Sequence, residues 1–219
     1  MAPTYFCRFP GSVLQRLSGS ALYLMSQSVP DNPKPDLRAA ALARRDALSA
    51  PERQAGAEAI AARAFPVFIS PGRIVSGFMP MKTELNPTPL MRKLAAAGAQ
   101  LALPVIDRRG NPLIMRAFKI GDALKGGQWG IREPLPEAPQ VDPDILIVPM
   151  AAFDRAGHRI GYGAGYYDMT IRALRAKKKV VAVGVAFAAQ EIPRVPATER
   201  DERLDFLMTE GETITFGQT

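Results

Sequence analysis

The sequence predicts an α/β protein with a three-layer αβα architecture around a mainly parallel, open, Rossmann-like sheet. Strand-like and helix-like segments alternate along the 219 residues, which is typical of βα units. The segments 145–149 and 180–187 are continuously apolar, as in strands that helices cover on both faces. Such sheets bind ligands beyond the carboxyl ends of their strands, so we expect the site in the loops after Met79, Pro149 and Phe187.

The regular pattern begins at Lys34, and the length fits about one domain, so residues 34–219 are predicted to form a single domain. Residues 36–48 have a loosely spaced apolar face and are predicted to be a helix. Ser49 and Glu52 have the spacing of a capping box, which predicts a second helix that runs to about residue 65.

Apolar runs, proline starts and glycine stops predict the elements that follow. The Gly- and Pro-rich stretch 121–144 is expected to be a long ordered loop, with a turn at 107–111 and a proline-bearing loop at 192–201. The predicted strands are 73–79, 100–106, 113–118, 145–149, 180–187, 206–209 and 213–216, and the predicted helices are 86–98 and 166–177.

The chain has one cysteine and one histidine, which restricts the kinds of metal site and disulfide that it can form. Cys7 is the single cysteine, which excludes an intrachain disulfide and a cysteine metal cage and fits a reducing, cytoplasmic compartment. His158 is the single histidine, and we expect it to be a loop residue. A metal in this protein must therefore be held by carboxylates, water and substrate phosphates, which favours Mg²⁺ over Zn²⁺.

The formal net charge of +7 fits three hypotheses: nucleic-acid binding, a basic surface without a specific partner, or an enzyme whose substrates are polyanions. The densest basic runs, Arg44-Arg45 and 177–179, are short and lie near predicted helix ends, so nucleic-acid binding ranks last.

No apolar run reaches the ~18 residues of a membrane span. We expect a monomer or a weak homo-oligomer.

The first 33 residues differ from the rest of the chain. They contain Arg8, Arg16 and several serines but no acid before Asp31, which weakly resembles a targeting segment. Met25 is an alternative start. We expect residues 1–33 to be a disordered extension without a part in the function.

The segment 159–168, Arg-Ile-Gly-Tyr-Gly-Ala-Gly-Tyr-Tyr-Asp, is the most informative one. Alternating glycines allow backbone N–H groups to point into one concavity, and the helix predicted next adds positive potential, which suits a phosphate. An acid such as Asp168 fits beside a phosphate when Mg²⁺ is bound there. The segment is neither a Walker A loop nor a dinucleotide-binding turn. The alternative is a glycine-rich turn with tyrosines packed beneath it.

Four separated segments, 34–38, 78–84, 159–168 and 204–210, together resemble the 5-formyltetrahydrofolate cyclo-ligase family, also called 5,10-methenyltetrahydrofolate synthetases. The resemblance runs from Lys34 to about residue 216. It implies an ATP-dependent ligase of one-carbon metabolism that closes the ring of 5-formyltetrahydrofolate to 5,10-methenyltetrahydrofolate with release of ADP and phosphate. The resemblance implies a folate substrate with or without a polyglutamate tail. The implied partners are these small molecules, with no nucleic acid and no membrane.

The resemblance also implies the site residues. The implied catalytic residues are Lys34, Arg38 and Arg159. The implied ATP-binding residues are Lys34, Arg38, Arg159, Ile160, Gly161, Tyr162, Gly163, Ala164, Gly165, Tyr166, Tyr167 and Asp168. The implied folate-binding residues are Met79, Glu84, Trp129 and Tyr166, and the implied Mg²⁺ ligands are Asp168 and Asp205. The alternatives are core packing for Met79, loop anchoring for Trp129, a solvated helix start for Lys34 and Arg38, and an exposed acid for Asp205.

The chain departs from the family at two loop positions. Many members have a basic residue between the first two glycines and lysine or glycine between the next two, where this chain has Tyr162 and Ala164. More of the phosphate contact is then expected from the backbone, Arg159, Lys34 and Arg38. Two other functions remain open: a sugar-phosphate isomerase or nucleotide-binding protein on a similar sheet, since fold does not determine function, and a basic RNA-associated module.

Overall fold

The computed structural model describes residues 32–217. Lys34–Thr219 form one compact unit, to which the description below refers. The expected disordered extension 1–33 lies outside the described residues, apart from its last two positions. Among the described residues, no helix has both the length and the apolar character needed to cross a membrane.

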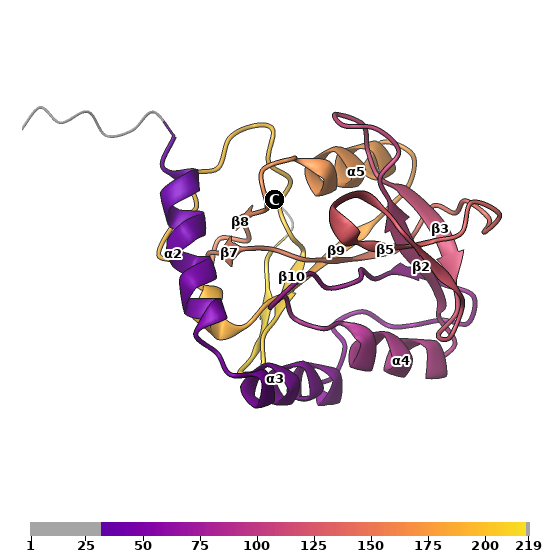
Figure 1. Cartoon of the computed structure of the whole chain (residues 1–219), viewed down its shortest axis with the longest axis horizontal. Coiled ribbons are helices and arrows are strands. Elements are labelled where there is room, and N and C mark those ends of the chain that lie inside the picture. Colours follow the sequence, from indigo (N-terminus) through magenta and orange to yellow (C-terminus); the bar gives the residue numbers. More distant parts are fainter. Residues whose placement is uncertain (1–31, 218–219) are drawn as a thin grey trace, which may run out of the picture. The chain divides into compact units, whose positions relative to one another are not determined.

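A seven-stranded sheet forms the middle layer (Figure 1). Its order is β11-β10-β9-β6-β1-β2-β3. The five inner strands are parallel to one another, and the edge strands β3 and β11 pair antiparallel with β2 and β10. The strands are β1 (Ile74–Ser76), β2 (Gln100–Val105), β3 (Ile114–Phe118), β6 (Ile145–Val148), β9 (Val181–Val185), β10 (Phe206–Met208) and β11 (Thr213–Thr215).

Helices cover both faces of the sheet. Figure 1 shows α3 (Ala50–Ala62) and α4 (Thr88–Ala96) on one side and α5 (Tyr166–Arg175) on the other. The additional helix α2 (Lys34–Asp46) packs beside the short strand β7 (Ala152–Phe153) and the 3₁₀ turn η2 (Ala188–Gln190). The predicted three-layer αβα fold with a mainly parallel sheet is therefore confirmed.

The central strand β6 shows why the sequence folds in this way. Its four residues are completely buried. Ile145 and Ile147 belong to the apolar cluster with α3 and α4, whereas Leu146 and Val148 belong to the cluster with α5. Because side chains alternate across a strand, a strand covered on both faces is apolar at every position.

The helix boundaries follow the capping signals. Ser49 accepts from the backbone N–H of Glu52, whose side chain accepts in return from the Ser49 N–H, which completes the capping box before α3. After α4 the chain turns at Gly98, whose φ of +99° suits glycine. The predicted bounds of the main elements differ from the observed ones by one to three residues at most ends.

The stretch 121–144, which was expected to be a long ordered loop, contains secondary structure that was not predicted. This stretch contains the hairpin of β4 (Leu124–Gly126) and β5 (Arg132–Pro134), joined by the 3₁₀ turn η1 (Gln128–Gly130). A second small hairpin, β7 with β8 (Arg159–Ile160), was also not predicted. Strands of two or three residues are too short to show a polarity pattern.

Gly184 in β9 has no side chain, which allows Met150, Leu204 and Leu207 to pack directly against the strand. A Cβ at this position would lie 2.6 Å from Met150 Cε, 2.7 Å from Leu204 Cδ1 and 2.8 Å from Leu207 Cδ1. We expect Gly184→Ala to destabilise the fold by about 1–3 kcal/mol through overpacking, which lowers Tm by about 2–4 °C per kcal/mol. Thermal unfolding followed by circular dichroism measures the change.

Gly211→Ala is the matched control, because a Cβ there would have its nearest neighbour at 3.7 Å. Its Tm should stay close to that of the wild type. Equal Tm values for the two variants would contradict the packing argument.

Candidate active site

A pocket of about 560 Å³ lies at the carboxyl ends of the parallel strands, a volume within the range of small-molecule sites. The loops after β1 and β6 contribute, as expected. The end of β2 and the hairpin β4–β5 also contribute, whereas the loop after Phe187 does not. The lining residues are Phe78, Met79, Met81, Glu84, Pro104, Ile106, Arg109, Leu113, Trp129, Ile131, Glu133, Pro149, Arg159, Gly161, Tyr162, Gly163, Ala164, Gly165, Tyr166, Tyr167 and Asp168.

The glycine loop, residues 161–165, lies between β8 and the first turn of α5. Gly163 has φ +103° and Gly165 has φ +67°, which are conformations that residues with a Cβ rarely adopt. Within the described residues, no backbone N–H of the glycine loop donates a hydrogen bond to the protein. The N–H groups of the first turn of α5 also have no partner within the helix. The loop thus presents consecutive backbone donors to the pocket, which suits an anion.

An ion pair joins Arg159, which precedes the glycine loop, to Asp168 in the first turn of α5. Arg159 Nη2 donates to Asp168 Oδ1 at 2.7 Å, and Arg159 Nη1 donates to the Glu202 carbonyl at 2.6 Å. Asp168 Oδ1 also accepts from the Glu202 N–H at 2.9 Å. The Arg159 side chain is 3% exposed, and that of Asp168 is 23% exposed. Arg159 therefore fixes the geometry of the loop as well as supplying positive charge to the pocket.

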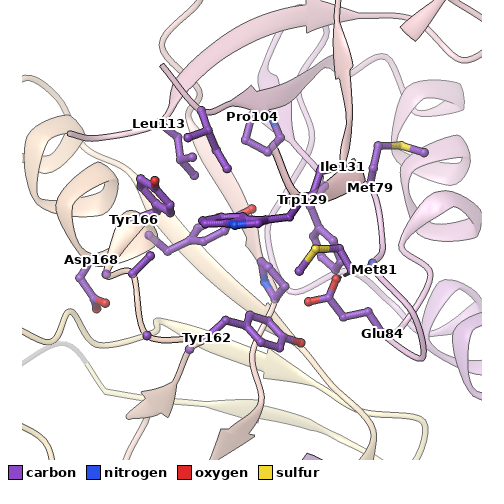
Figure 2. A pocket seen from close by; sticks show the side chains of 18 of the residues that line it. Met79, Met81, Glu84, Pro104, Leu113, Trp129, Ile131, Tyr162, Tyr166 and Asp168 are labelled. Atoms are coloured by element: carbon purple, nitrogen blue, oxygen red, sulfur yellow. Dashed lines mark hydrogen bonds between the residues drawn. The ribbon is translucent and has the colours of Figure 1, made fainter. Parts of the chain in front are cut away.

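Glu84 lies on another side of the pocket, where the Met81 N–H donates to its Oε2 at 2.8 Å. Burial raises the pKa of the Glu84 carboxyl above its ordinary value, while the Tyr162 hydroxyl, the Met81 N–H and the charge of Arg45 oppose the increase. Burial and the nearby Glu84 also raise the pKa of Tyr162, so its phenol stays protonated. Figure 2 shows Tyr162 and Glu84 together on the side of the pocket opposite Leu113 and Pro104.

Arg45, on α2, holds the Tyr162 hydroxyl in place. It is 4% exposed, and its Nη1 donates to Tyr162 Oη at 2.7 Å. Its Nε donates to Thr83 Oγ1 at 3.1 Å, which ties α2 to the segment that carries Glu84. Tyr162 thus links the glycine loop to the carboxylate of Glu84.

Aromatic rings line the pocket next to the glycine loop. Trp129 is 67% exposed, and its ring centroid lies 6.2 Å from that of Tyr166 (Figure 2). Tyr166 and Tyr167 both line the pocket, and their hydroxyls are buried without a hydrogen-bond partner in the described residues. A flat, apolar ligand fits against such a surface.

Four of the residues implied by the resemblance do not line the pocket. Arg38 lies nearest, because its Nε donates to the Gly161 carbonyl at 2.7 Å. Lys34 forms an ion pair with Asp201 at 2.7 Å. Ile160 is buried in an apolar cluster with Ala41.

The structure does not bring Asp205 to Asp168. Asp205 precedes β10, and its Oδ2 accepts from Arg175 at 2.9 Å and from the Ala182 N–H at 2.7 Å, at the amino end of β9. The pocket lies at the opposite, carboxyl ends of these strands. The carboxylate of Asp205 therefore bonds Arg175 and the backbone at the far end of the sheet, and it does not line the pocket.

The sequence analysis missed other lining residues. Met81 follows β1, Ile106 follows β2, and Pro104 lies near the carboxyl end of β2, so a position at or after the end of a strand was the available signal. Ile131 and Glu133 belong to the hairpin, which the sequence analysis did not predict. Arg109 lies in an exposed turn, where a basic residue carries no specific signal.

The donor set fits a magnesium ion better than a metal held by protein alone. Among the described residues, no group of three His, Cys, Asp or Glu side chains is arranged to hold a metal. In the described part of the chain, Asp168 Oδ2 makes no hydrogen bond, and Asp168 lines the pocket beside the glycine loop. One carboxylate beside a phosphate-binding loop is the arrangement in which Mg²⁺ takes its remaining ligands from phosphates and water.

Comparisons with known proteins show the family of this chain. Residues 30–210 match the model of the 5-formyltetrahydrofolate cyclo-ligase family. The chain is 32% identical to the 5-formyltetrahydrofolate cyclo-ligase of Mycolicibacterium smegmatis over 183 residues, which cover 80% of this chain and 93% of that protein. It is 31% identical to that of Escherichia coli K12 over 175 residues, or 76% and 94% of the two chains.

Solved structures show the same fold. The 5,10-methenyltetrahydrofolate synthetase of Aquifex aeolicus aligns with a TM-score of 0.69 and 31% identity, covering 85% of this chain and 95% of the other. That of Mycoplasma pneumoniae aligns with a TM-score of 0.61 at 20% identity, covering 81% and 98%. The resemblance inferred from the four sequence segments is confirmed.

Tyr162→Phe should raise the pKa of Glu84 further, because the Tyr162 hydroxyl lowers it in the wild type. A titration of the labelled Glu84 carboxyl by ¹³C NMR measures the shift. The matched control is Tyr166→Phe, which removes a hydroxyl without a hydrogen-bond partner in the described residues and should leave the Glu84 pKa unchanged. An unchanged pKa in Tyr162→Phe would show that the hydroxyl does not act on this carboxylate.

Proposed function

Since the chain belongs to the 5-formyltetrahydrofolate cyclo-ligase family, we propose that this pocket is its active site and that ATP and 5-formyltetrahydrofolate bind there side by side. The protein is an ATP-dependent ligase that closes 5-formyltetrahydrofolate to 5,10-methenyltetrahydrofolate, with release of ADP and phosphate. The sugar-phosphate alternative is not favoured, because this chain aligns with 93% and 94% of the length of two relatives that are named 5-formyltetrahydrofolate cyclo-ligases.

One observation supports this use of the pocket above the others: the glycine loop, whose N–H groups have no protein acceptor in the described residues, lines the same cavity as the half-buried carboxylate of Glu84. The N–H groups and Arg159 suit the phosphates of ATP. Glu84 suits a pterin, since a carboxylate accepts paired hydrogen bonds from an amino group and a ring N–H. Trp129, Met79 and Tyr166 provide apolar surface for the folate rings.

Phosphoryl transfer depends mainly on positioning and charge neutralisation. The formyl oxygen of the folate attacks the γ-phosphate of ATP, and ADP leaves. N10 then attacks the activated carbon, phosphate leaves, and the N10 proton is lost. The protein residues hold the two substrates in line, and the walls of the pocket exclude water from the activated intermediate.

Mg²⁺ is proposed as the metal of this reaction. Asp168 is the residue that would hold it, and the ion would neutralise charge that develops on the transferred phosphate. Lys34 and Arg38 remain predicted ATP contacts from α2, and Arg38 lies close enough to the glycine loop to act there without a large movement. We place the reaction in the cytoplasm, on the basis of the single cysteine.

The activity test mixes the protein with MgATP and 5-formyltetrahydrofolate and follows the near-ultraviolet absorbance of the methenyl product together with ADP release. We expect folate-dependent ATP turnover. Glu84→Ala should lower kcat/KM for the folate at least ~100-fold, because each hydrogen bond to a charged group contributes about 1.5–3 kcal/mol. Folded wild-type protein without turnover would refute the proposed function.

A pair of variants tests the metal. Asp168→Asn keeps an acceptor for Arg159 but weakens the ligand, so the Mg²⁺ concentration for half-maximal rate should rise ~10-fold or more, equivalent to about 1.4 kcal/mol. Asp205→Asn, at the other end of the strands, should leave the Mg²⁺ dependence unchanged. A similar shift in both variants would restore Asp205 as a ligand, and a shift in neither would place the ion elsewhere.

A further inference from the structure

Glu133 is a buried carboxylate in the wall of the pocket that has no role in the function described above. It is 4% exposed and lines the pocket from β5 of the hairpin. Acidic side chains are almost never buried to this extent without a partner. The other two carboxylates of the pocket, Glu84 and Asp168, are already assigned to the pterin and the metal.

The partners of Glu133 account for only one of its oxygens. Its Oε1 accepts from the backbone N–H of Ile106 at 3.1 Å. In the described part of the chain, Oε2 has no hydrogen-bond donor. Lys125 stands opposite Glu133 in the hairpin register, but no ion pair joins their side chains there.

The backbone leaves space for this carboxylate. A Cβ on Gly127 would lie 2.2 Å from the carboxyl carbon of Glu133 and 2.5 Å from each of its oxygens. The glycine at the start of the η1 turn is therefore what allows the acid to lie under the hairpin. Oε1 joins the hairpin to the end of β2 through the Ile106 N–H, and Oε2 is available to accept a further hydrogen bond.

The second oxygen of such a side chain is stabilised when a donor reaches it, because burial of the residue removes most of its hydration. Since Glu133 lines the pocket, a ligand bound there can supply that donor. The phosphates of ATP present only acceptors, which a carboxylate repels, and the donors of ATP are its adenine amino group and ribose hydroxyls. Glu133 lies in the same hairpin as Trp129, the proposed folate contact, which favours the folate as the donor. The reduced folate presents N–H groups on its pterin ring and at N10, which a carboxylate oxygen accepts well.

We propose that Glu133 is a second folate-binding carboxylate, whose Oε2 accepts a hydrogen bond from an N–H group of 5-formyltetrahydrofolate while its Oε1 holds the Trp129 hairpin on Ile106. This inference rests on the proposed function of the pocket. It makes Glu133 a specificity determinant for the folate and leaves ATP binding to the glycine loop.

Glu133→Gln separates binding from architecture. A carboxamide has one acceptor oxygen, which can keep the bond to the Ile106 N–H, and an NH₂ group, which would then meet the N–H of the folate donor to donor. Trp129 is the only tryptophan of the chain, so the intrinsic fluorescence of the ligand-free protein reports the position of the hairpin. The control is Glu137→Gln, which changes an exposed acid in the segment after the hairpin.

We expect Glu133→Gln to raise the KM for 5-formyltetrahydrofolate at least tenfold, with the KM for ATP within twofold of the wild type and the fluorescence unchanged. Glu137→Gln should match the wild type in all three. A folate KM within twofold of the wild type would overturn the proposal. A parallel rise in both KM values with a shifted fluorescence spectrum would also overturn it, because it would show a purely structural role.

The test is independent of the activity test. Absence of turnover in the wild type would refute the proposed function. A wild type that turns over while Glu133→Gln retains its folate KM would refute the role of Glu133 alone.

Discussion

The ion pair between Arg159 and Asp168 is the interaction on which the geometry of the site depends. Both residues also bond the backbone of Glu202, so one buried guanidinium fixes β8, the first turn of α5 and the chain before β10. A buried guanidinium is tolerated when acceptors surround it, as the Asp168 carboxylate and the Glu202 carbonyl do for Arg159. With both ends held, the glycine loop has little freedom left to lose when a ligand binds. The backbone donors are therefore preorganised.

The pocket separates two kinds of recognition. At the glycine loop the ligand meets backbone N–H groups, the amino end of α5 and Arg159, all of which favour an anion. At Glu84 it meets a carboxylate that favours N–H donors. Tyr162 belongs to both regions, because it lies in the loop and contacts the carboxylate. A basic residue at this position would add positive charge to the loop, whereas the tyrosine, held by Arg45, couples the loop to Glu84 instead.

The sequence predicted what depends on local patterns. The apolar runs of β6 and β9, the Ser49 capping box and the glycine loop before α5 all contain their signal within a few residues. What was missed depends on contacts distant in sequence. The hairpin β4–β5 is stabilised against β2, and Asp205 is held by Arg175, 30 residues away. The motif match alone does not reveal that pairing, so Asp205 remained a candidate ligand until its surroundings were visible.

The hairpin shows why a site can hide in a segment without a sequence pattern. Trp129 has φ 56° and ψ 21°, a left-handed conformation that costs a residue with a side chain about 1–2 kcal/mol. Its ring is nevertheless mostly exposed and gains little burial in return. Strain without compensating packing is found where a binding surface is held in place. The Glu133 bond to the Ile106 N–H joins this hairpin to the end of β2, where β5 also packs, and these contacts hold the aromatic ring beside the pocket.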